Sequence, residues 1–477
     1  MTSCISQYDA LRPKVQGAMR NRNFAAGLSL LQNYLVMHEP EFPVLKDMAG
    51  CYWGIGDDIT TMRLMQSMVQ AWPDNPEVWN DLGVYLMMTG HKQAACSALD
   101  TALKLSPKSV SAICARNFIE PFDTRSRYVQ TLRRVTTSKT SSSRERVHAH
   151  SALGIVHDHA GQYGEAFRHF GRANARRKEP YEKHRVEKLV AAQIRRCPRF
   201  PLMMVGHPSV IFVAGLPRSG TTLVDRILSR HSEVRSVGES HALTDTLRAF
   251  RSHLGSRYGR LDYYAWVDFI ETEDMTPFRE MFFDANAASP RETGSVIVSK
   301  MPLDCLEMGF ARALIPDARF VFVNRHPLDV GLSLYRTNFK SGHGFTRKLG
   351  WIGHMMRHVY LSLDNYKQRL GPALRVQSYR RLVEAPQEQV IDLLTHCGLS
   401  FEPGCMEPEK GHGSVRTASL LQVRASINRS GLGKWHRYAT QLEPLVAALG
   451  GQSWLDDWAL RDLEAASGVT ISQRKAS

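Results

Sequence analysis

The chain contains 477 residues, which is too long for one ordinary domain, so we expect at least two domains. Apolar residues make up 43% and charged residues 22%, and this globular composition excludes a disordered chain, a collagen-like fibre and a disulfide-stapled miniprotein. The 61 Lys and Arg residues outnumber the 46 Asp and Glu residues, which gives a net charge of +15 and favours acidic partners such as nucleic acid, an anionic membrane or a phosphorylated small molecule.

The cysteines are scattered, with no CxxC pair and no cysteine and histidine at metal-ligand spacing. We therefore predict reduced cysteines that act as small buried apolar residues, and we expect no metal site. The first residues lack the basic and then apolar pattern of a signal peptide. No run of about 18 uncharged apolar residues occurs, so we predict no membrane span and a cytoplasmic location.

The first part of the chain repeats a pattern of large and small apolar residues. One copy consists of Trp79, Leu82, Gly83, Leu86, Ala95, Leu99, Ala102 and Pro107. A weaker copy one period earlier consists of Leu45, Met48, Ala49, Tyr52, Met65, Met68 and Pro73, and a third consists of Leu153, Gly154, Ala166, Phe170 and Ala173. The period and the residue types are typical of tetratricopeptide (TPR) helical hairpins of about 34 residues. We predict an all-α TPR-like solenoid over 1–196, with degraded units at 8–41 and 110–146.

The segment 110–200 contains 19 Lys and Arg residues but only 8 Asp and Glu residues. It is either a solvated outer face of the helices or a surface that attracts an acidic peptide. No aromatic residues alternate with these charges in the manner of nucleic-acid-binding segments, so we expect no nucleic-acid partner.

A second domain follows a proline-rich break. Three prolines lie in 197–209, so we predict a linker over 197–208. Short β-rich runs then occur at Val210–Ala214, Val296–Ser299, Phe320–Asn324 and Leu374–Ser378, separated by helical stretches. This alternation predicts an α/β domain with a central parallel sheet over 209–450, and a C-terminal tail over 451–477.

The strongest motif is a glycine-rich loop between a strand and a helix. The apolar run Val210–Ala214 leads into Gly215-Leu-Pro-Arg-Ser-Gly220-Thr-Thr222, and an amphipathic helix follows. This order is that of a P-loop, in which backbone N–H groups and a helix N-terminus surround an anion. The position of the usual P-loop lysine is occupied by Thr221, and the cation lies inside the loop at Arg218. The loop therefore predicts binding of one terminal phosphate-like group without a magnesium-bound triphosphate.

These residues resemble a known family. The PRSGTT loop after a buried strand is similar to the 5′-phosphosulfate loop of sulfotransferases that use PAPS (3′-phosphoadenosine-5′-phosphosulfate). The resemblance is strongest to the tyrosylprotein-sulfotransferase-like branch, including bacterial proteins with TPR repeats before the sulfotransferase domain. It implies an α/β P-loop sulfotransferase domain, PAPS as sulfuryl donor, and Arg218, Ser219, Gly220, Thr221 and Thr222 as donor-binding residues.

The resemblance extends to later segments. It implies that Glu239, 21 residues after Arg218, is the catalytic base, and that Lys300 stabilises the leaving group. Two departures from the family pattern are Val237-Gly238 before the carboxylate and Asp304, where a neutral residue is common. Arg218 would hold the sulfuryl oxygens and is counted as catalytic too.

The same resemblance implies that Arg325 and Ser333 bind the 3′-phosphate, that Tyr379 contacts the nucleotide, and that Lys434, six residues after Asn428, belongs to a closing loop. The residues themselves leave simpler interpretations open.

Glu239 could be a surface acid and Lys300 a solvated lysine at a strand end. Arg325 could pair with Asp329, Ser333 could be a buried helix hydroxyl and Tyr379 could only pack.

Three histidines lie near these motifs. We interpret His231, His241 and His326 as structural, with His241 as the reserve candidate for the base.

The sequence thus predicts a sulfotransferase that moves a sulfuryl group from PAPS to a hydroxyl acceptor. The leading hypothesis for the acceptor is a tyrosine of a protein or peptide that the TPR domain holds. The alternatives are a carbohydrate, lipid or small phenol acceptor, a P-loop kinase, and an inactive TPR scaffold. The sequence does not indicate the oligomeric state.

Overall fold

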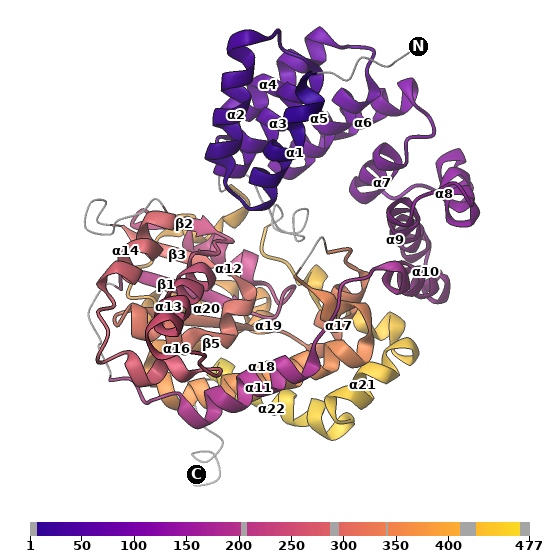
Figure 1. Ribbon diagram of the computed structural model, residues 1–477. Coiled ribbons are helices and arrows are strands. Elements are labelled where there is room, and N and C mark those ends of the chain that lie inside the picture. The colour runs from indigo at the N-terminus through magenta and orange to yellow at the C-terminus, as the bar shows by residue number, and fades with distance from the viewer. Residues whose placement is uncertain (1–6, 202–207, 287–294, 340–341, 411–425, 468–477) are drawn as a thin grey trace. The chain divides into compact units, whose positions relative to one another are not determined.

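The computed structural model describes the chain except for residues 1–6, 202–207, 287–294, 340–341, 411–425 and 468–477 (Figure 1). The described residues divide into two compact units between Ala160 and Gly161. Within the described ranges, no helix combines the length and the apolar character that a membrane crossing requires.

The first unit consists of helices joined by short turns. They are α1 (Gln7–Arg20), α2 (Phe24–Met37), α3 (Phe42–Ile55), α4 (Asp58–Ala71), α5 (Pro76–Thr89), α6 (Lys92–Leu105), α7 (Val110–Ile119), α8 (Arg127–Thr137) and α9 (Ser143–His159). The turn sequences explain where they begin and end. The Asn75 side chain caps α5 by accepting from the backbone N–H of Glu77, and Gly90 ends the helix in the left-handed conformation.

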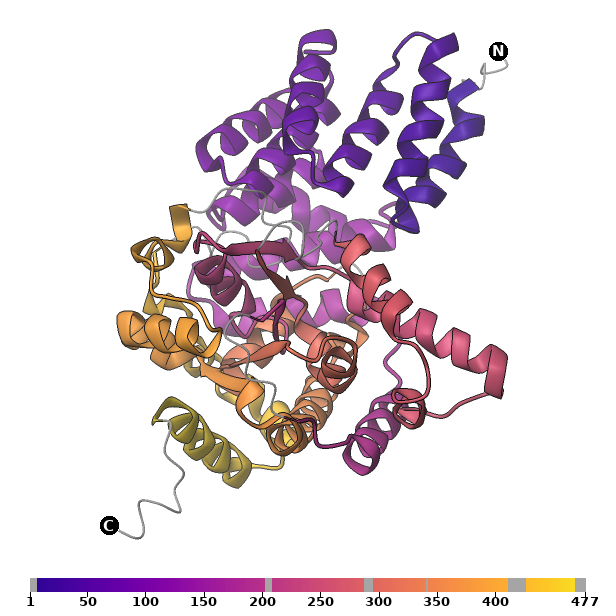
Figure 2. The same cartoon turned by 90° about the vertical axis from the view of Figure 1, so that its left-hand side faces the viewer.

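Neighbouring helices of this unit pack as pairs, stacked side by side (Figure 2). In the pair α5 and α6, a Cβ on Gly83 would lie only 2.6 Å from Cγ of Leu99, so only glycine allows this close approach. The Trp79 indole N–H donates to the carbonyl oxygen of Pro73 at 2.7 Å and fixes the turn before the pair. Paired helices at the predicted positions confirm the all-α character of this region.

The second unit begins earlier than the predicted domain boundary at 196. Its first helices, α10 (Tyr163–Arg176) and α11 (Lys183–Arg196), pack on the α/β part of the chain. The Asn174 amide donates to the carbonyl oxygen of Tyr335 at 2.8 Å, and Phe167 stacks on the Tyr335 ring with centroids 4.9 Å apart. These long-range contacts place both helices with the second unit. A repeat pattern in the sequence gives no information on such contacts.

A five-stranded parallel sheet forms the centre of the second unit, in the order β2-β3-β1-β4-β5. The strands are β1 (Val210–Gly215), β2 (Val234–Gly238), β3 (Val296–Lys300), β4 (Arg319–Asn324) and β5 (Leu374–Ser378). All residues of β1, β3 and β4 are buried, which explains their continuous apolar runs. The four predicted strands and the parallel sheet are confirmed, and β2 was not predicted.

Helices cover both faces of this sheet (Figure 1). The helices of this unit that follow β1 are α12 (Thr221–Leu228), α13 (Ala242–Tyr258), α14 (Thr276–Ala285), α16 (Met308–Leu314), α17 (Pro327–Arg336), α18 (Leu349–Leu370), α19 (Tyr379–Glu384), α20 (Pro386–His396), α21 (Glu443–Leu449) and α22 (Gln452–Ser467). The apolar side of α12 joins the residues of β1, β3 and β4 in one buried cluster, so the helix after the glycine-rich loop is fixed to the sheet.

The segment predicted as a C-terminal tail contains α22, which packs on β5 and α21. Its buried Asp462 accepts hydrogen bonds from Asn324 at 2.6 Å and from Ser378 at 2.9 Å. These two residues end β4 and β5, so α22 joins the ends of two neighbouring strands. The sequence of α22 gave no sign that Asp462 has this role.

Candidate active site

The predicted functional side chains gather at one edge of the sheet. Glu239 directly follows β2 and Lys300 ends β3, whereas Arg325 follows β4 and Tyr379 follows β5. The glycine-rich loop follows β1, the central strand. Because the strands are parallel, their carboxyl ends meet at the same edge, which is where α/β sheets bind ligands.

Lys300 and Glu239 form a direct ion pair. Nζ of Lys300 donates to Oε1 of Glu239 at 2.7 Å. The Lys300 side chain is 1% exposed and that of Glu239 is 34% exposed, so a desolvated ammonium faces a carboxylate that solvent reaches. The solvated lysine that the sequence left open is therefore wrong.

A β-bulge aims Glu239 at this lysine. The register between β2 and β3 shifts between Ser236 and Gly238, and Gly238 has a φ of 63°, which favours glycine. The extra residue is Val237. The departure from the family pattern at Val237-Gly238 is thus a bulge that turns the chain directly before the carboxylate.

A second carboxylate near Lys300 was missed in the sequence. Asp225 lies on α12, is buried, and accepts a hydrogen bond from the Ser236 hydroxyl at 2.6 Å. Burial raises the pKa of Asp225, and the charge of Lys300 lowers it. The same hydroxyl accepts from the backbone N–H of Gly238 at 3.1 Å, so Asp225 supports the bulge. The available signal was an aspartate next to Arg226 on an eight-residue helix that is otherwise rich in apolar residues.

The glycine-rich loop is closely packed. Gly220 has a φ of 115° and precedes α12, and a Cβ at this position would overlap the Tyr379 ring. The side chains of Ser219, Thr221 and Thr222 are all buried. Oγ of Ser219 is buried without a hydrogen-bond partner. An unpaired buried hydroxyl is costly, and an anion placed at the N-terminus of α12 would satisfy it.

Arg218 is a partly buried cation inside the loop. Its φ is 73°, and its Nε donates to Oγ of Ser333 at 2.9 Å. Burial, followed by the charges of Arg325 and Arg336, lowers the pKa of Arg218 to about 10. Arg218 therefore remains charged at neutral pH. The positive charges of these three guanidinium groups repel one another. An anion bound between them would relieve this repulsion.

Arg325 and Tyr379 meet beside the loop. The Arg325 guanidinium lies over the Tyr379 ring, 4.7 Å from its centroid. Nη1 of Arg325 donates to the carbonyl oxygen of Arg218 at 2.9 Å, and Nη2 donates to that of Gly431. Nε of Arg325 is buried without a partner, as is the Ser219 hydroxyl. Two hydrogen bonds thus fix the side chain, and its Nε donor is left for a ligand.

Arg325 and Asp329, both described residues, do not form the ion pair that the sequence left open. Asp329 instead accepts from the backbone N–H groups of Gly433 at 2.8 Å and Trp435 at 3.1 Å. These contacts fix the segment that contains Lys434. Lys434 itself is exposed. Part of the predicted closing loop, 411–425, lies outside the described residues.

The histidines near the motifs occupy different environments. His231 is buried and contacts the carbonyl oxygen of Ser400 at 3.0 Å. His326 stacks on Trp435 with centroids 5.1 Å apart, and burial lowers its pKa to about 4, so it is neutral at physiological pH. His241 is exposed at the start of α13.

Asp304 departs from the family pattern less than its charge suggests. The residue is 5% exposed, and burial raises the pKa of its carboxyl well above the ordinary value, with a further increase from Glu307. Burial therefore favours the neutral, protonated form of the Asp304 side chain.

Residues 208–403 match the family model described as "Sulfotransferase family". This segment of the chain is therefore similar to sulfotransferases.

Two curated relatives show how the similarity is distributed. An "Uncharacterized protein" of Aquifex aeolicus (strain VF5) is 28% identical over 86% of this chain and 54% of the relative, so the chain spans about half the length of that relative. A "Putative protein-tyrosine sulfotransferase" of Caenorhabditis briggsae is 24% identical over 52% of this chain and 91% of the relative.

Among solved structures, the sulfotransferase domain of the olefin synthase of Synechococcus PCC 7002 aligns with 50% of this chain and 91% of that domain. It does so at 16% sequence identity and a TM-score of 0.35.

Proposed function

We propose that the chain transfers a sulfuryl group from PAPS to a hydroxyl acceptor, most specifically a tyrosine of a protein or peptide. The contact between Lys300 and Glu239, at the sheet edge that also bears the loop of Arg218, is the main support. A base, a leaving-group cation and an anion-binding loop are the groups that this reaction needs, and the family match supports the same donor.

Each residue has a separate task in this proposal. Glu239 accepts the proton of the acceptor hydroxyl, whose oxygen forms a bond to sulfur while the bond from sulfur to the phosphate oxygen breaks. Lys300 donates to that phosphate oxygen as its negative charge increases. Arg218 binds the sulfuryl oxygens. Asp225 does not contact the reacting groups and positions the bulge before Glu239.

The residues of the loop fit a donor with two separate phosphate groups. Ser219, Gly220, Thr221 and Thr222 would hold the 5′ end, at the N-terminus of α12. Arg325, Ser333, Tyr379 and Lys434 would hold the 3′ end and the adenine nucleotide. Each of these two groups of residues contains one unpaired buried donor. It is Oγ of Ser219 in the group for the 5′ end and Nε of Arg325 in the group for the 3′ end. PAPS supplies the sulfuryl group when bound.

A kinase that uses ATP and Mg²⁺ is the principal alternative, and binding measurements separate the two. We expect calorimetry of the purified chain to show tight binding of 3′,5′-bisphosphoadenosine and PAPS and much weaker binding of ATP with Mg²⁺. Tight ATP binding without bisphosphoadenosine binding would contradict the proposal. Arg325→Ala should lower bisphosphoadenosine affinity at least tenfold, on the order of one lost charged contact.

The matched control for that variant is Arg380→Ala. Arg380 forms an exposed ion pair with Glu384 on α19, at 3.0 Å. It lies one residue after Tyr379 but donates along its own helix, so its removal should leave bisphosphoadenosine affinity unchanged.

The tyrosine acceptor depends on the name of a relative and on the helical first unit. The Caenorhabditis briggsae relative is named for protein-tyrosine sulfotransfer, and TPR arrays hold extended peptides. The test is transfer of labelled sulfate from PAPS to a lysate of the source organism, with mass spectrometry of the labelled products. Label on tyrosine supports this acceptor, whereas label on carbohydrate, lipid or a small phenol refutes it and keeps the sulfotransferase. Absence of label with every acceptor would support the inactive scaffold.

A further inference from the structure

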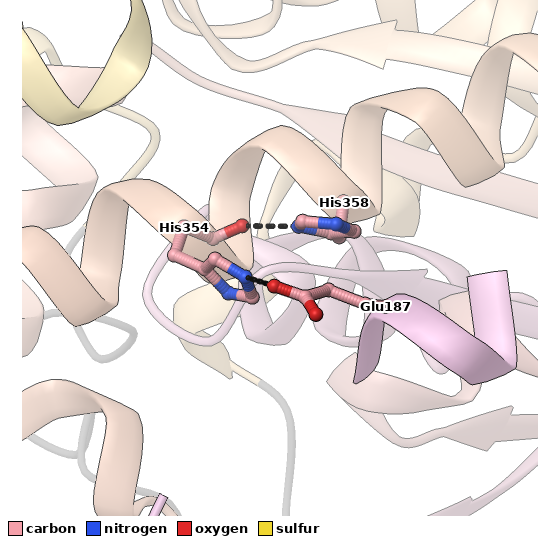
Figure 3. Close-up of side chains that lie close together, drawn as sticks. All are labelled: Glu187, His354 and His358. Carbon is pink, nitrogen blue, oxygen red and sulfur yellow. Dashed lines mark hydrogen bonds and ion pairs between the residues drawn. The ribbon is translucent and has the colours of Figure 1, made fainter. Parts of the chain in front are cut away.

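Three potential metal ligands converge where two distant helices pack together. Glu187 lies on α11, and His354 and His358 lie one turn apart on α18. Figure 3 shows the two imidazole rings and the carboxylate facing one another. One ligand atom from each residue lies within 4.8 Å of the other two. None of the three belongs to the proposed transfer site, so this arrangement is independent of the proposed function.

We propose that Glu187, His354 and His358 bind a divalent metal ion of the zinc class, and that the ion joins α11 to α18. Two imidazoles and one carboxylate are a ligand set that zinc uses, and histidines four residues apart lie on one face of a helix. The site takes imidazole and carboxylate donors without sulfur, which disfavours copper(I), and its nitrogen donors disfavour magnesium and calcium.

The other ring nitrogens of both histidines already have partners. Nδ1 of His354 contacts the Tyr181 hydroxyl at 2.7 Å, and Nδ1 of His358 contacts the carbonyl oxygen of His354 at 2.8 Å. Histidines that bind metals usually have their second nitrogen fixed by a carboxylate, a backbone carbonyl or water, and at His354 the Tyr181 hydroxyl takes this place. Both rings therefore present Nε2 as the ligand atom.

The distances require little movement for an ion to bind. Nε2 of His354 already lies 2.9 Å from Oε1 of Glu187. Ligands that surround zinc tetrahedrally at about 2.0–2.1 Å lie about 3.4 Å from one another. The Glu187 side chain is 50% exposed, so it can rotate to admit the ion. The ligand atom of His358 lies within 4.8 Å of the other two, so this ring also needs only a small adjustment.

The electrostatics favour ligands in the protonation states that metal binding needs. The hydrogen bond from His354 is the largest cause that lowers the pKa of Glu187, and the charges of His354, His358 and His184 lower it further. Burial lowers the pKa of His354, and the neighbouring His358 and Lys183 add to this effect although Glu187 opposes it. Both directions favour the forms that bind a metal ion, an ionised carboxylate and a neutral imidazole.

The test is a calorimetric titration of tag-free, metal-stripped full-length chain with Zn²⁺, and with Mg²⁺ in a separate arm. We expect one zinc ion to bind and Mg²⁺ not to bind. His358→Ala should weaken zinc binding at least 100-fold, since it removes a ligand but leaves the contact between His354 and Glu187 intact. Tyr181→Phe should weaken it about tenfold, as is usual for a group that orients a ligand.

The matched control is His253→Ala. His253 contacts Glu273 at 2.9 Å, the same distance as His354 and Glu187, and these two residues have no place in the described metal-ligand group. This variant should bind zinc as the unmodified chain does. Glu187→Gln keeps the size of the side chain and should lose zinc binding even if His358→Ala fails to fold.

Zinc should also raise the urea midpoint of unfolding in the unmodified chain and not in Glu187→Gln, because a ligand that binds only the folded state stabilises it. Absence of zinc binding, or binding that both His358→Ala and Glu187→Gln leave unchanged, would overturn the proposal. The contact between Glu187 and His354 would then be only a hydrogen bond that joins two helices.

Discussion

Replacement of Lys300 by methionine separates catalysis from folding at the proposed transfer site. Lys300→Met retains the length of the side chain and removes the ammonium that lies 2.7 Å from Glu239. One charged donor to an oxygen that gains negative charge contributes about 2.7–4 kcal/mol to the transition state. We therefore expect kcat for sulfuryl transfer to fall about 10²–10³-fold, while bisphosphoadenosine still binds.

The same substitution should cost little stability. Removal of one partner from a fully buried ion pair costs about 3–5 kcal/mol. Here the Glu239 side chain is 34% exposed, so water can solvate the carboxylate that remains, and methionine fills the buried volume. Asp225, whose pKa Lys300 lowers, can take up a proton instead of remaining charged. We expect a loss below about 2 kcal/mol in the free energy of unfolding.

The assay is single-turnover transfer of labelled sulfate from PAPS, together with urea unfolding of the same samples. Lys410→Met is the matched control, because Lys410 contacts Glu407 at the same 2.7 Å but has a side chain that is 61% exposed. It should change neither quantity appreciably. Turnover of Lys300→Met within about threefold of the unmodified chain would refute the leaving-group role. So would a loss of activity that unfolding of the variant fully explains.

Tyr379→Ala should weaken bisphosphoadenosine binding about tenfold in calorimetry, whereas Tyr379→Phe should not, because the ring that faces Arg325 contributes about 1–2 kcal/mol. Burial raises the pKa of Glu307 from 4.5 to about 7, so the folded state retains a proton that the unfolded state releases. Stability should therefore decrease by about 3 kcal/mol as pH rises from 4.5 to 7, and urea unfolding of Glu307→Gln should lack this decrease. Gly83→Ala should destabilise the chain by about 1–3 kcal/mol in urea unfolding by overpacking against Leu99, whereas Gly164→Ala, with open space at its Cβ, should be neutral or stabilising.

The fold was predictable where burial dominates the sequence. Strands β1, β3 and β4 are buried on both faces, so each reads as a continuous apolar run. Strand β2 lies at the edge of the sheet and is only partly buried. Its residues include Arg235 and Ser236, and such a short mixed segment has no periodicity that distinguishes a strand from a loop.

The candidate site was predictable as a set of residues but not as a geometry. The loop motif and strand ends indicated Arg218, Lys300 and Arg325, and the resemblance supplied their roles. The contact of Lys300 with Glu239 depends on a bulge, which one sequence does not reveal. The group of Glu187 and His354 was not predictable, because these residues are 167 positions apart and neither belongs to a metal-binding motif.

Helix α22 has a practical consequence for work with fragments of this chain. The match to the family model ends at residue 403, and a fragment designed on that boundary would discard Asp462. The last residues of β4 and β5, Asn324 and Ser378, would then lose the acceptor they share, directly before Arg325 and Tyr379. A fragment that folds but binds the proposed nucleotide weakly would reflect where the chain was cut. Expression of the second unit should therefore extend through residue 467.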